Sequence, residues 1–313
     1  MTVTEALTND VPESRTSAPF WLLLGGDLDQ DRITAELTDG FERVLGDRGA
    51  VVRTSDLVLG VCGGRLTLHD LRGVPLTPPE LVYARLSTPK LSTDREITLL
   101  RHLEGMGTAL LNPIDAVLAC VNKFWHLQQL AAAGLPVPDT HTYVDASMTD
   151  VVRAGIPEPC VVKSVRGHRG RRVFLAPDRA MLDDIQGSLR DEVPYLFQKY
   201  VRYSHGRDLR VVVVDGQAVA AQVRVAADGG LKSNLALGGT STPCAGLHPA
   251  GEALAVAAAK VLGLTVAGVD LLFEPDGSFT ICEVNANVGW RRHLDRIVPA
   301  IAAACDARLR AGR

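Results

Sequence analysis

The last third of the chain alternates strand-type segments with turns, and this pattern is what most constrains its fold. The strand-type runs read YLFQKYV, DLRVVVV, QAVAAQVRV, VAGVDLLF and SFTICEVN. Asp215-Gly216 separates the second run from the third, and the segment 274–277 (EPDG) separates the last two. Both are typical tight-turn sequences. The pattern predicts antiparallel hairpins, which form an α+β region together with helices expected at 251–262 and around 293–309.

The first hundred residues follow a different order. A strand-type run at 20–26 precedes apolar residues at helical spacing over 33–45, and a second strand-type run covers 50–61. This strand-helix-strand order favours a parallel sheet with helices packed on it. The chain is therefore predicted to combine an α/β part with an α+β part.

Composition excludes several classes of protein. The 313 residues are 46% hydrophobic and 22% charged with a net charge of -3, which gives no broad basic surface for nucleic acid or membrane. The six cysteines are far apart and form no C-x-x-C pair, so neither a disulfide framework nor a zinc site is expected. Residues 1–17 lack the features of a signal peptide and are expected to be a disordered tail. We expect a soluble, cytoplasmic protein with no nucleic-acid or membrane partner.

The run FTICEVNAN ends an apolar strand with a carboxylate and a carboxamide two positions apart. Alternation along a strand places Glu283 and Asn285 on one face, and the same parity would add Phe279 and Ile281 to that face. Both polar groups offer the hard oxygen atoms that Mg²⁺ prefers. The alternative is a solvated strand end followed by a turn.

Asp270 lies on the preceding strand-type run. If residues 274 and 277 pair across the turn, Asp270 lies opposite Ile281 and diagonal to Glu283, on one face of the hairpin. Asp270, Glu283 and Asn285 would then form an oxygen-rich metal site. A slip of one residue would send Glu283 to the other face.

Two lysines and a basic loop can bind phosphate. Lys163 lies on a strand face with valines, where an unpaired ammonium would be costly, and Lys123 lies near the start of a predicted helix. The segment 166–172 (RGHRGRR) contains Gly167 and Gly170, whose backbone N–H groups can wrap phosphates beside the arginines. The alternatives are lysines whose heads reach water and a solvated or RNA-contacting basic loop.

A second glycine-rich segment, 229–239, adds further donors. Cationic and amide groups in and near it are Arg224, Lys232 and Asn234, and Asp208 and Arg210 share one strand face upstream. Converging donors suit an anionic substrate, although each residue alone could be a surface residue. A plain two-residue turn at 215–216 would put Arg224 on the face opposite Asp208 and Arg210, so a bulge or a longer turn is required if all three meet.

These pieces, in this order, resemble the ATP-grasp superfamily, specifically its RimK-like branch of amino-acid and peptide ligases. The segments that carry the resemblance are NKFWHLQQLAAAGLPVP, VVKSVRGHRG, LFQKYV, GRDLRVVVV, AAQVRVA, LKSNLALGG, VAGVDLL and CEVNANVG, within about residues 120–290. The resemblance implies three domains: an N-terminal α/β domain at 18–115 and two ATP-grasp sheet domains at 116–195 and 196–313. ATP would be held between the two sheets.

The resemblance also implies a set of site residues. The residues expected to contact ATP are Lys123, Lys163, Gly167, Gly170, Gln198, Tyr200, Val201, Asp208 and Lys232. Those expected to hold magnesium, as two ions or with manganese as the alternative, are Asp270, Glu283 and Asn285. Those expected to act on the acyl phosphate and an acidic substrate are Arg210, Arg224 and Asn234. Two positions depart from the family pattern: Arg172 replaces a usual glycine and Val288 a usual proline.

The implied function is an ATP- and Mg²⁺-dependent ligase that joins a carboxylate to an amine through an acyl phosphate. Its substrate would be an amino acid, a peptide, or a protein or ribosomally made peptide terminus, and the resemblance leaves a homo-oligomer open. Two alternatives keep the nucleotide site: an ATP-grasp kinase that phosphorylates a small hydroxyl compound, and a non-catalytic nucleotide-binding module.

Overall fold

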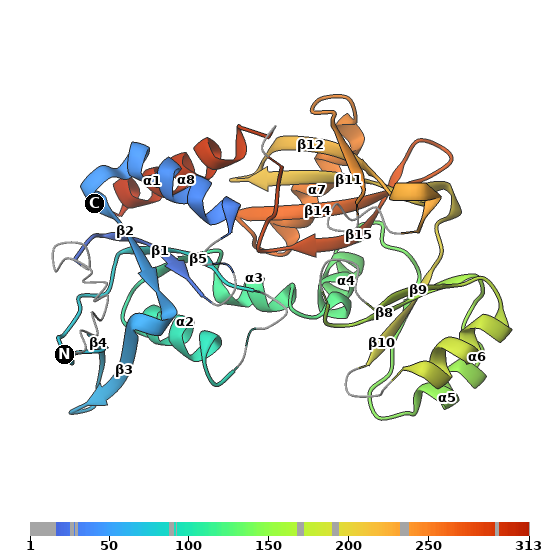
Figure 1. Ribbon diagram of the computed structural model, residues 1–313, viewed down its shortest axis with the longest axis horizontal. Coiled ribbons are helices and arrows are strands. Elements are labelled where there is room, and N and C mark those ends of the chain that lie inside the picture. Colours follow the sequence, from blue (N-terminus) through green and yellow to red (C-terminus); the bar gives the residue numbers. More distant parts are fainter. Residues whose placement is uncertain are drawn as a thin grey trace, which may run out of the picture. The chain divides into compact units, whose positions relative to one another are not determined.

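The computed structural model describes residues 17–25, 28, 31–87, 91, 93–167, 172–189, 194–231, 238–291 and 294–312 (Figure 1). The chain divides into two compact units. The first contains Met1–Ser87, Ser92–Leu111 and Ala302–Arg313, and the second contains Thr88–Leu91 and Asn112–Ile301. Among the described helices, none is long and apolar enough to cross a membrane.

The first unit is built on a parallel sheet with strand order β2-β1-β5-β6. Its strands are β1 (Phe20–Leu24), β2 (Gly49–Arg53), β5 (Leu81–Arg85) and β6 (Ala109–Leu111). The elements beside it are α1 (Arg32–Leu45), α2 (Glu96–Gly105), the antiparallel pair β3 (Leu57–Cys62) and β4 (Arg65–Asp70), and α8 (Ile297–Ala311) from Ala302 onward. β1 is buried along its whole length, as its apolar sequence FWLLL requires. The predicted parallel α/β part is confirmed.

The second unit contains an antiparallel sheet of order β7-β10-β8-β9. Its strands are β7 (Thr140–His141), β10 (Tyr195–Lys199), β8 (Cys160–Ser164) and β9 (Val173–Ala176). Helices α5 (Met148–Arg153) and α6 (Arg179–Ser188) pack with the face that carries Val162 and Phe197. The opposite face carries Leu196, which packs against Leu127 of α4 (Lys123–Ala132). Alternation places Lys163 and Gln198 on this opposite face.

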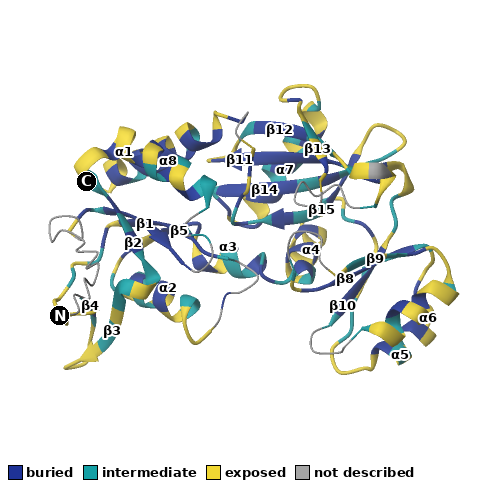
Figure 2. Cartoon of the chain, in the orientation of Figure 1, coloured by how far each residue is buried: buried dark blue, intermediate teal, exposed yellow. Residues whose placement is uncertain are grey.

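A second antiparallel sheet of the same unit has the order β13-β12-β11-β14-β15. Its strands are β11 (Arg207–Val214), β12 (Gln217–Val225), β13 (Thr240–Pro243), β14 (Val266–Phe273) and β15 (Phe279–Asn285). One face packs against α7 (Pro249–Val261), and α3 (Ile114–Ala119) adds to the same core. Figure 2 shows β11 buried along almost its whole length. The two predicted hairpins, β11–β12 and β14–β15, are confirmed.

The register of the β14–β15 hairpin differs from the prediction. Phe273 pairs with Phe279, and the Glu274 amide donates to the Ser278 carbonyl, so the turn is one residue longer than a pairing of 274 with 277 requires. On its own, this turn would place Glu283 on the face opposite Asp270. The predicted pairing of Asp270 with Ile281 was wrong.

A β-bulge in β15 corrects the facing. Leu271 pairs with Ile281 whereas Asp270 pairs with Glu283, so Cys282 is an extra residue without a partner on β14. Ile281 therefore belongs to the core beside α7, and Glu283 lies on the other face with Asp270. The prediction that Phe279 and Ile281 share a face with Glu283 was wrong, because alternation restarts at the bulge.

A second bulge lies in β12, where one was required for the arginines to meet. Val212 pairs with Ala220 and Val213 with Ala218, which leaves Val219 as the extra residue. Beyond this bulge, Asp208 lies directly opposite Arg224. Each hairpin thus carries one extra residue between its turn and its polar end.

Candidate functional site

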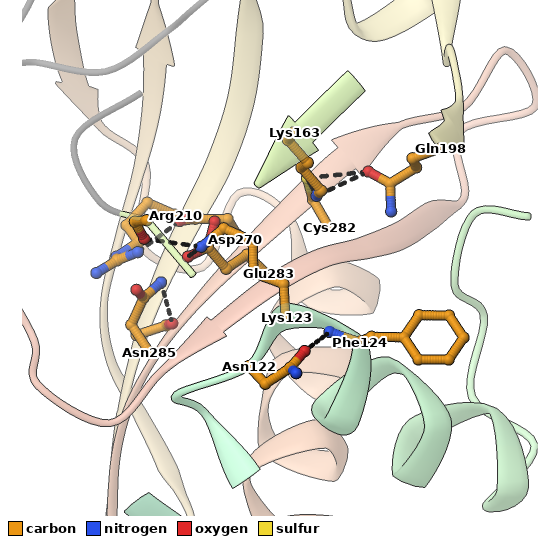
Figure 3. Close-up of polar contacts among 12 residues, drawn as sticks. Asn122, Lys123, Phe124, Lys163, Gln198, Arg210, Asp270, Cys282, Glu283 and Asn285 are labelled. Atoms are coloured by element: carbon orange, nitrogen blue, oxygen red, sulfur yellow. Dashed lines mark hydrogen bonds and ion pairs between the residues drawn. The ribbon is translucent and has the colours of Figure 1, made fainter. Parts of the chain in front are cut away.

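Three oxygen-bearing residues lie together on the sheet β13-β12-β11-β14-β15, on the face that points away from α7. Asp270 is directly opposite Glu283, and Asn285 is opposite Gly268, whose carbonyl accepts from the Asn285 amide at 3.4 Å (Figure 3). No cluster of three or more His, Cys, Asp or Glu side chains able to hold a metal occurs among the residues described. The donor set here is instead two carboxylates and one carboxamide. Its hard oxygens fit magnesium, the ion that the sequence predicts for these three residues.

Two arginines from neighbouring strands bind the carboxylate of Asp270. Arg210 donates from Nη1 to Asp270 Oδ1 at 2.7 Å, and Arg224 Nη2 lies 2.8 Å from the same oxygen. Arg224 also binds Asp208 through two contacts, one of them from Nε to Oδ1 at 2.9 Å. All four side chains are at most 13% exposed. The network is therefore a buried one, in which each charge depends on its partners.

Electrostatics hold Arg224 in its charged form. Burial alone would lower its pKa, but the carboxylates of Asp270 and Asp208 raise the pKa above its usual value. The guanidinium is therefore positive at every physiological pH. Its charge is balanced by the carboxylates of Asp208 and Asp270.

Glu283 is paired with the first residue of a helix. Asn122 caps α4 by accepting from the Phe124 amide at 2.9 Å, and this places Lys123 in the first turn. Lys123 Nζ lies 2.7 Å from Glu283 Oε1 and donates to the Gly167 carbonyl at 3.0 Å. Burial raises the pKa of Glu283, but the positive charges of Lys123 and Lys163 outweigh it and lower the pKa to about 2. The carboxylate is thus ionised, and Lys123 is its ion-pair partner.

Lys163 is buried and paired, which explains how an ammonium is accommodated on β8. It is 4% exposed and donates to Gln198 Oε1 at 2.9 Å, while Gln198 Nε2 donates to Thr140 Oγ1 at 3.0 Å. The alternative in which the lysine head reaches water does not apply. These hydrogen bonds fix the Lys163 ammonium and the Gln198 amide on one face of the sheet β7-β10-β8-β9 (Figure 3).

Sequence reasoning missed two residues beside these groups. Alternation along a regular strand would place Cys282 on the face opposite Glu283, but its Sγ lies 4.0 Å from Lys163 Nζ and 3.9 Å from Gln198 Oε1. His126 is fully buried, and neither of its ring nitrogens has a hydrogen-bond partner among the described residues. Burial is the main cause that lowers the pKa of His126 to about 3, so the ring is neutral. Its spacing of three residues from Lys123 was the available signal, because such residues share a helix face.

The other predicted residues lie in different settings. Tyr200, directly after β10, hydrogen-bonds through its hydroxyl to His205 Nδ1 at 2.6 Å, and Val201 follows it. Gly170, Lys232 and Asn234 lie outside the described residues. Arg172 has φ 54°, in the left-handed region that favours glycine. The glycine usual in the family at this position would adopt that conformation without strain.

Together these side chains form a polar region suited to a multiply charged anion. Its cations are Lys123, Lys163, Arg210 and Arg224, and its carboxylates are Asp208, Asp270 and Glu283. Fixed cations of this kind stabilise charge on phosphate oxygens when water is excluded. A divalent ion bound by the carboxylates would add further positive charge at the same place.

Comparison with known proteins identifies the same family that the sequence motifs resemble. The model of the RimK-like ATP-grasp domain matches residues 120–304. N-acetylaspartylglutamate synthase A of Mus musculus is 47% identical over 255 residues, 80% of this chain and 64% of the relative. Beta-citrylglutamate synthase B of Homo sapiens is 42% identical over 287 residues, 88% of this chain and 73% of the relative.

Solved structures share the fold. The ATP-grasp ligase PsnB, in a complex with a phosphomimetic variant of its minimal precursor, Mg and ADP, matches with a TM-score of 0.67 and 22% identity. That match covers 93% of this chain and 99% of PsnB. The chain spans about two thirds of the length of the synthases named above. From the matched domain, the relatives and the shared fold, the chain belongs to the RimK-like ATP-grasp family.

Proposed function

We propose that this protein is an ATP- and Mg²⁺-dependent ligase that joins a carboxylate to an amine. The observation that carries the proposal is the facing of Asp270 and Glu283 across β14 and β15, with Asn285 on the same side. These oxygens lie beside four buried or partly buried cations in one unit of the chain. A site of this composition suits phosphoryl transfer, for which positioning and charge stabilisation are the main requirements.

The residues divide into two roles. Lys123 and Lys163 are placed to hold nucleotide phosphates, and Arg210 and Arg224 to orient a substrate carboxylate. A carboxylate oxygen attacks the γ-phosphorus and ADP leaves, which gives an acyl phosphate. The amine nitrogen then attacks the acyl carbon, the C–N bond forms, the C–O bond to phosphate breaks, and the amine proton is released. Magnesium, when bound, neutralises phosphate charge during the first transfer.

The names of the relatives support a narrower choice of substrate. Both synthases named above carry glutamate in the product that their names state. We therefore propose glutamate as the first amine to test, and a small acid whose carbon beside the carboxylate carries an acylamino or a hydroxyl group as the partner. Two metal ions, manganese as a substitute and a cytoplasmic location belong to the same proposal. The free state of all six cysteines supports a reducing compartment.

The test is an ADP-release screen. Purified protein is incubated with ATP, Mg²⁺, glutamate and a panel of small carboxylates, and products are identified by mass spectrometry. Hydroxylamine in place of the amine should give a hydroxamate from the acyl phosphate. A stable phosphorylated alcohol would instead indicate a kinase, and ATP binding without ADP release across the panel would indicate a binding module. The Asp270→Asn/Glu283→Gln double variant should be inactive, and undiminished turnover would refute the metal assignment.

A further inference from the structure

We propose that Gly268 is a positioning residue for Arg210, whose guanidinium can lie in place only because position 268 has no side chain. The inference rests on the proposed function for its catalytic meaning. Its geometric part stands alone, because it concerns only how Arg210 is packed on the sheet.

The space above Gly268 is filled by Arg210. A Cβ atom at Gly268 would lie 2.5 Å from Arg210 Nη2, 2.7 Å from Cζ and 2.9 Å from Nε. All three contacts are shorter than carbon makes with non-bonded atoms in folded proteins. Even alanine at position 268 would therefore displace the guanidinium.

The conformation of the backbone does not itself call for a glycine at this position. Gly268 is paired in the middle of β14, between β11 and β15, and its φ is not in the left-handed region. A glycine inside a strand weakens the strand and often marks a close approach of another group. Here the approaching group is the guanidinium of Arg210.

Apart from its packing above Gly268, Arg210 makes few contacts that fix its position. Its Nη1 binds Asp270, but its buried Nε has no hydrogen-bond partner within the described part of the chain. The same holds for the buried Oε1 of Gln222, which is opposite Arg210 on β12. The guanidinium therefore binds Asp270 on one side and fills the space above Gly268 on the other, and Figure 3 shows Arg210 beside Asp270 and Asn285.

The Arg210 guanidinium lies where the proposed metal site and the proposed carboxylate-binding site meet. The same guanidinium contacts Asp270, a proposed metal ligand, and lies over the residue that pairs with Asn285, another proposed ligand. A substrate carboxylate bound by Arg210 would be held next to the metal. Displacement of the guanidinium should therefore weaken use of the carboxylate substrate more than use of ATP.

The first experiment is a double-variant cycle in thermal unfolding. Gly268→Ala should lower Tm by about 3 °C in the wild-type background. In the Arg210→Ala background the same change should lower Tm by less than about 1 °C, because the atoms it meets are gone. Gly251→Ala is the matched control: its Cβ would lie 2.6 Å from Leu209 on the opposite face of the sheet, so it should lower Tm equally in both backgrounds.

An equal loss for Gly268→Ala in both backgrounds would overturn the proposal. If Gly268→Ala alone does not fold, the double variant with Arg210→Ala should fold like Arg210→Ala itself. Failure of the double variant to fold as well would show that something other than Arg210 requires the glycine.

The second experiment measures steady-state kinetics. Gly268→Ala should raise KM for the carboxylate substrate about tenfold and KM for ATP less than about twofold, since a charge-assisted contact is displaced. Gly251→Ala should change neither KM value. Equal increases in both KM values would overturn the positioning role. If no substrate pair gives ADP release, the proposed ligase function fails, while the thermal cycle still decides whether Gly268 positions Arg210.

Discussion

Asp270 lies directly opposite Glu283, although the turn that joins their strands would by itself place the two carboxylates on opposite faces of the sheet. The extra residue Cys282 restores the facing. The apolar residues nearer the turn keep their places in the core beside α7, and the two carboxylates point the other way. The candidate metal site thus depends on one irregularity in β15.

Isosteric changes at this pair should remove metal-dependent turnover. Asp270→Asn or Glu283→Gln keeps the shape of the side chain but loses one negative charge, and ADP release should fall about 100-fold or more. A coupled ADP assay at several Mg²⁺ concentrations measures the effect. Asp276→Asn, in the exposed turn of the same hairpin, is the matched control and should stay within about twofold. Loss of activity in the control alone would contradict the assignment.

Removing Arg224 should destabilise the fold. Arg224→Met leaves Asp208 and Asp270 short of a partner in a buried network, so the free energy of unfolding should fall by about 3 kcal/mol or more. Urea denaturation monitored by circular dichroism measures it. Arg101→Met breaks an exposed ion pair with Glu104 and should cost less than about 1 kcal/mol. Similar losses in the two variants would show that the Arg224 network contributes no more than a surface pair.

Glu283 should make stability depend on pH in acid. Lys123 and Lys163 lower its folded pKa to about 2, against an ordinary value of 4.5, so it stabilises the fold above about pH 4.5 and loses this contribution as the pH falls toward 2. In the presence of EDTA, the difference in free energy of unfolding between wild type and Glu283→Gln should shrink over that interval. Parallel pH curves for the two proteins would show that the carboxylate is not held in its charged form.

Lys163 should matter for the nucleotide. Lys163→Met keeps the length of the side chain but removes the buried ammonium, and the affinity for a non-hydrolysable ATP analogue should fall about tenfold or more in calorimetry. The control is Lys199→Met at the end of the neighbouring strand β10. The Lys199 side chain is 64% exposed, so its removal should leave the affinity unchanged. Equal affinities for wild type and Lys163→Met would place the nucleotide elsewhere.

The elements of the fold were predictable because local signals agree with it. Period-two alternation and the turns at 215–216 and 274–277 predicted the hairpins, and helical spacing over 33–45 predicted α1. The partners of the site residues were not predictable. Lys163 and Gln198 are 35 residues apart, and their pairing follows from the register of β8 and β10, which no local pattern specifies.

The register of the last hairpin illustrates a specific limit. Parity placed Asp270 and Glu283 together through two errors that offset each other: the turn is one residue longer than expected, and β15 contains one residue more than a regular strand. In β12, by contrast, geometry alone required an irregularity, and Val219 supplies it. Neither extra residue carries a distinctive sequence, because a bulge is specified by packing on both sides of it.

The bulge at Cys282 divides β15 into two parts. The residues before it pack in the core beside α7, and Glu283 and Asn285 after it face the candidate site. Removal of the one extra residue would leave Leu271 opposite Ile281 and Asp270 opposite the glutamate, so both parts would keep their facing. In relatives, a single-residue gap in an alignment near this point would therefore be compatible with an intact site, whereas a gap between Glu283 and Asn285 would not.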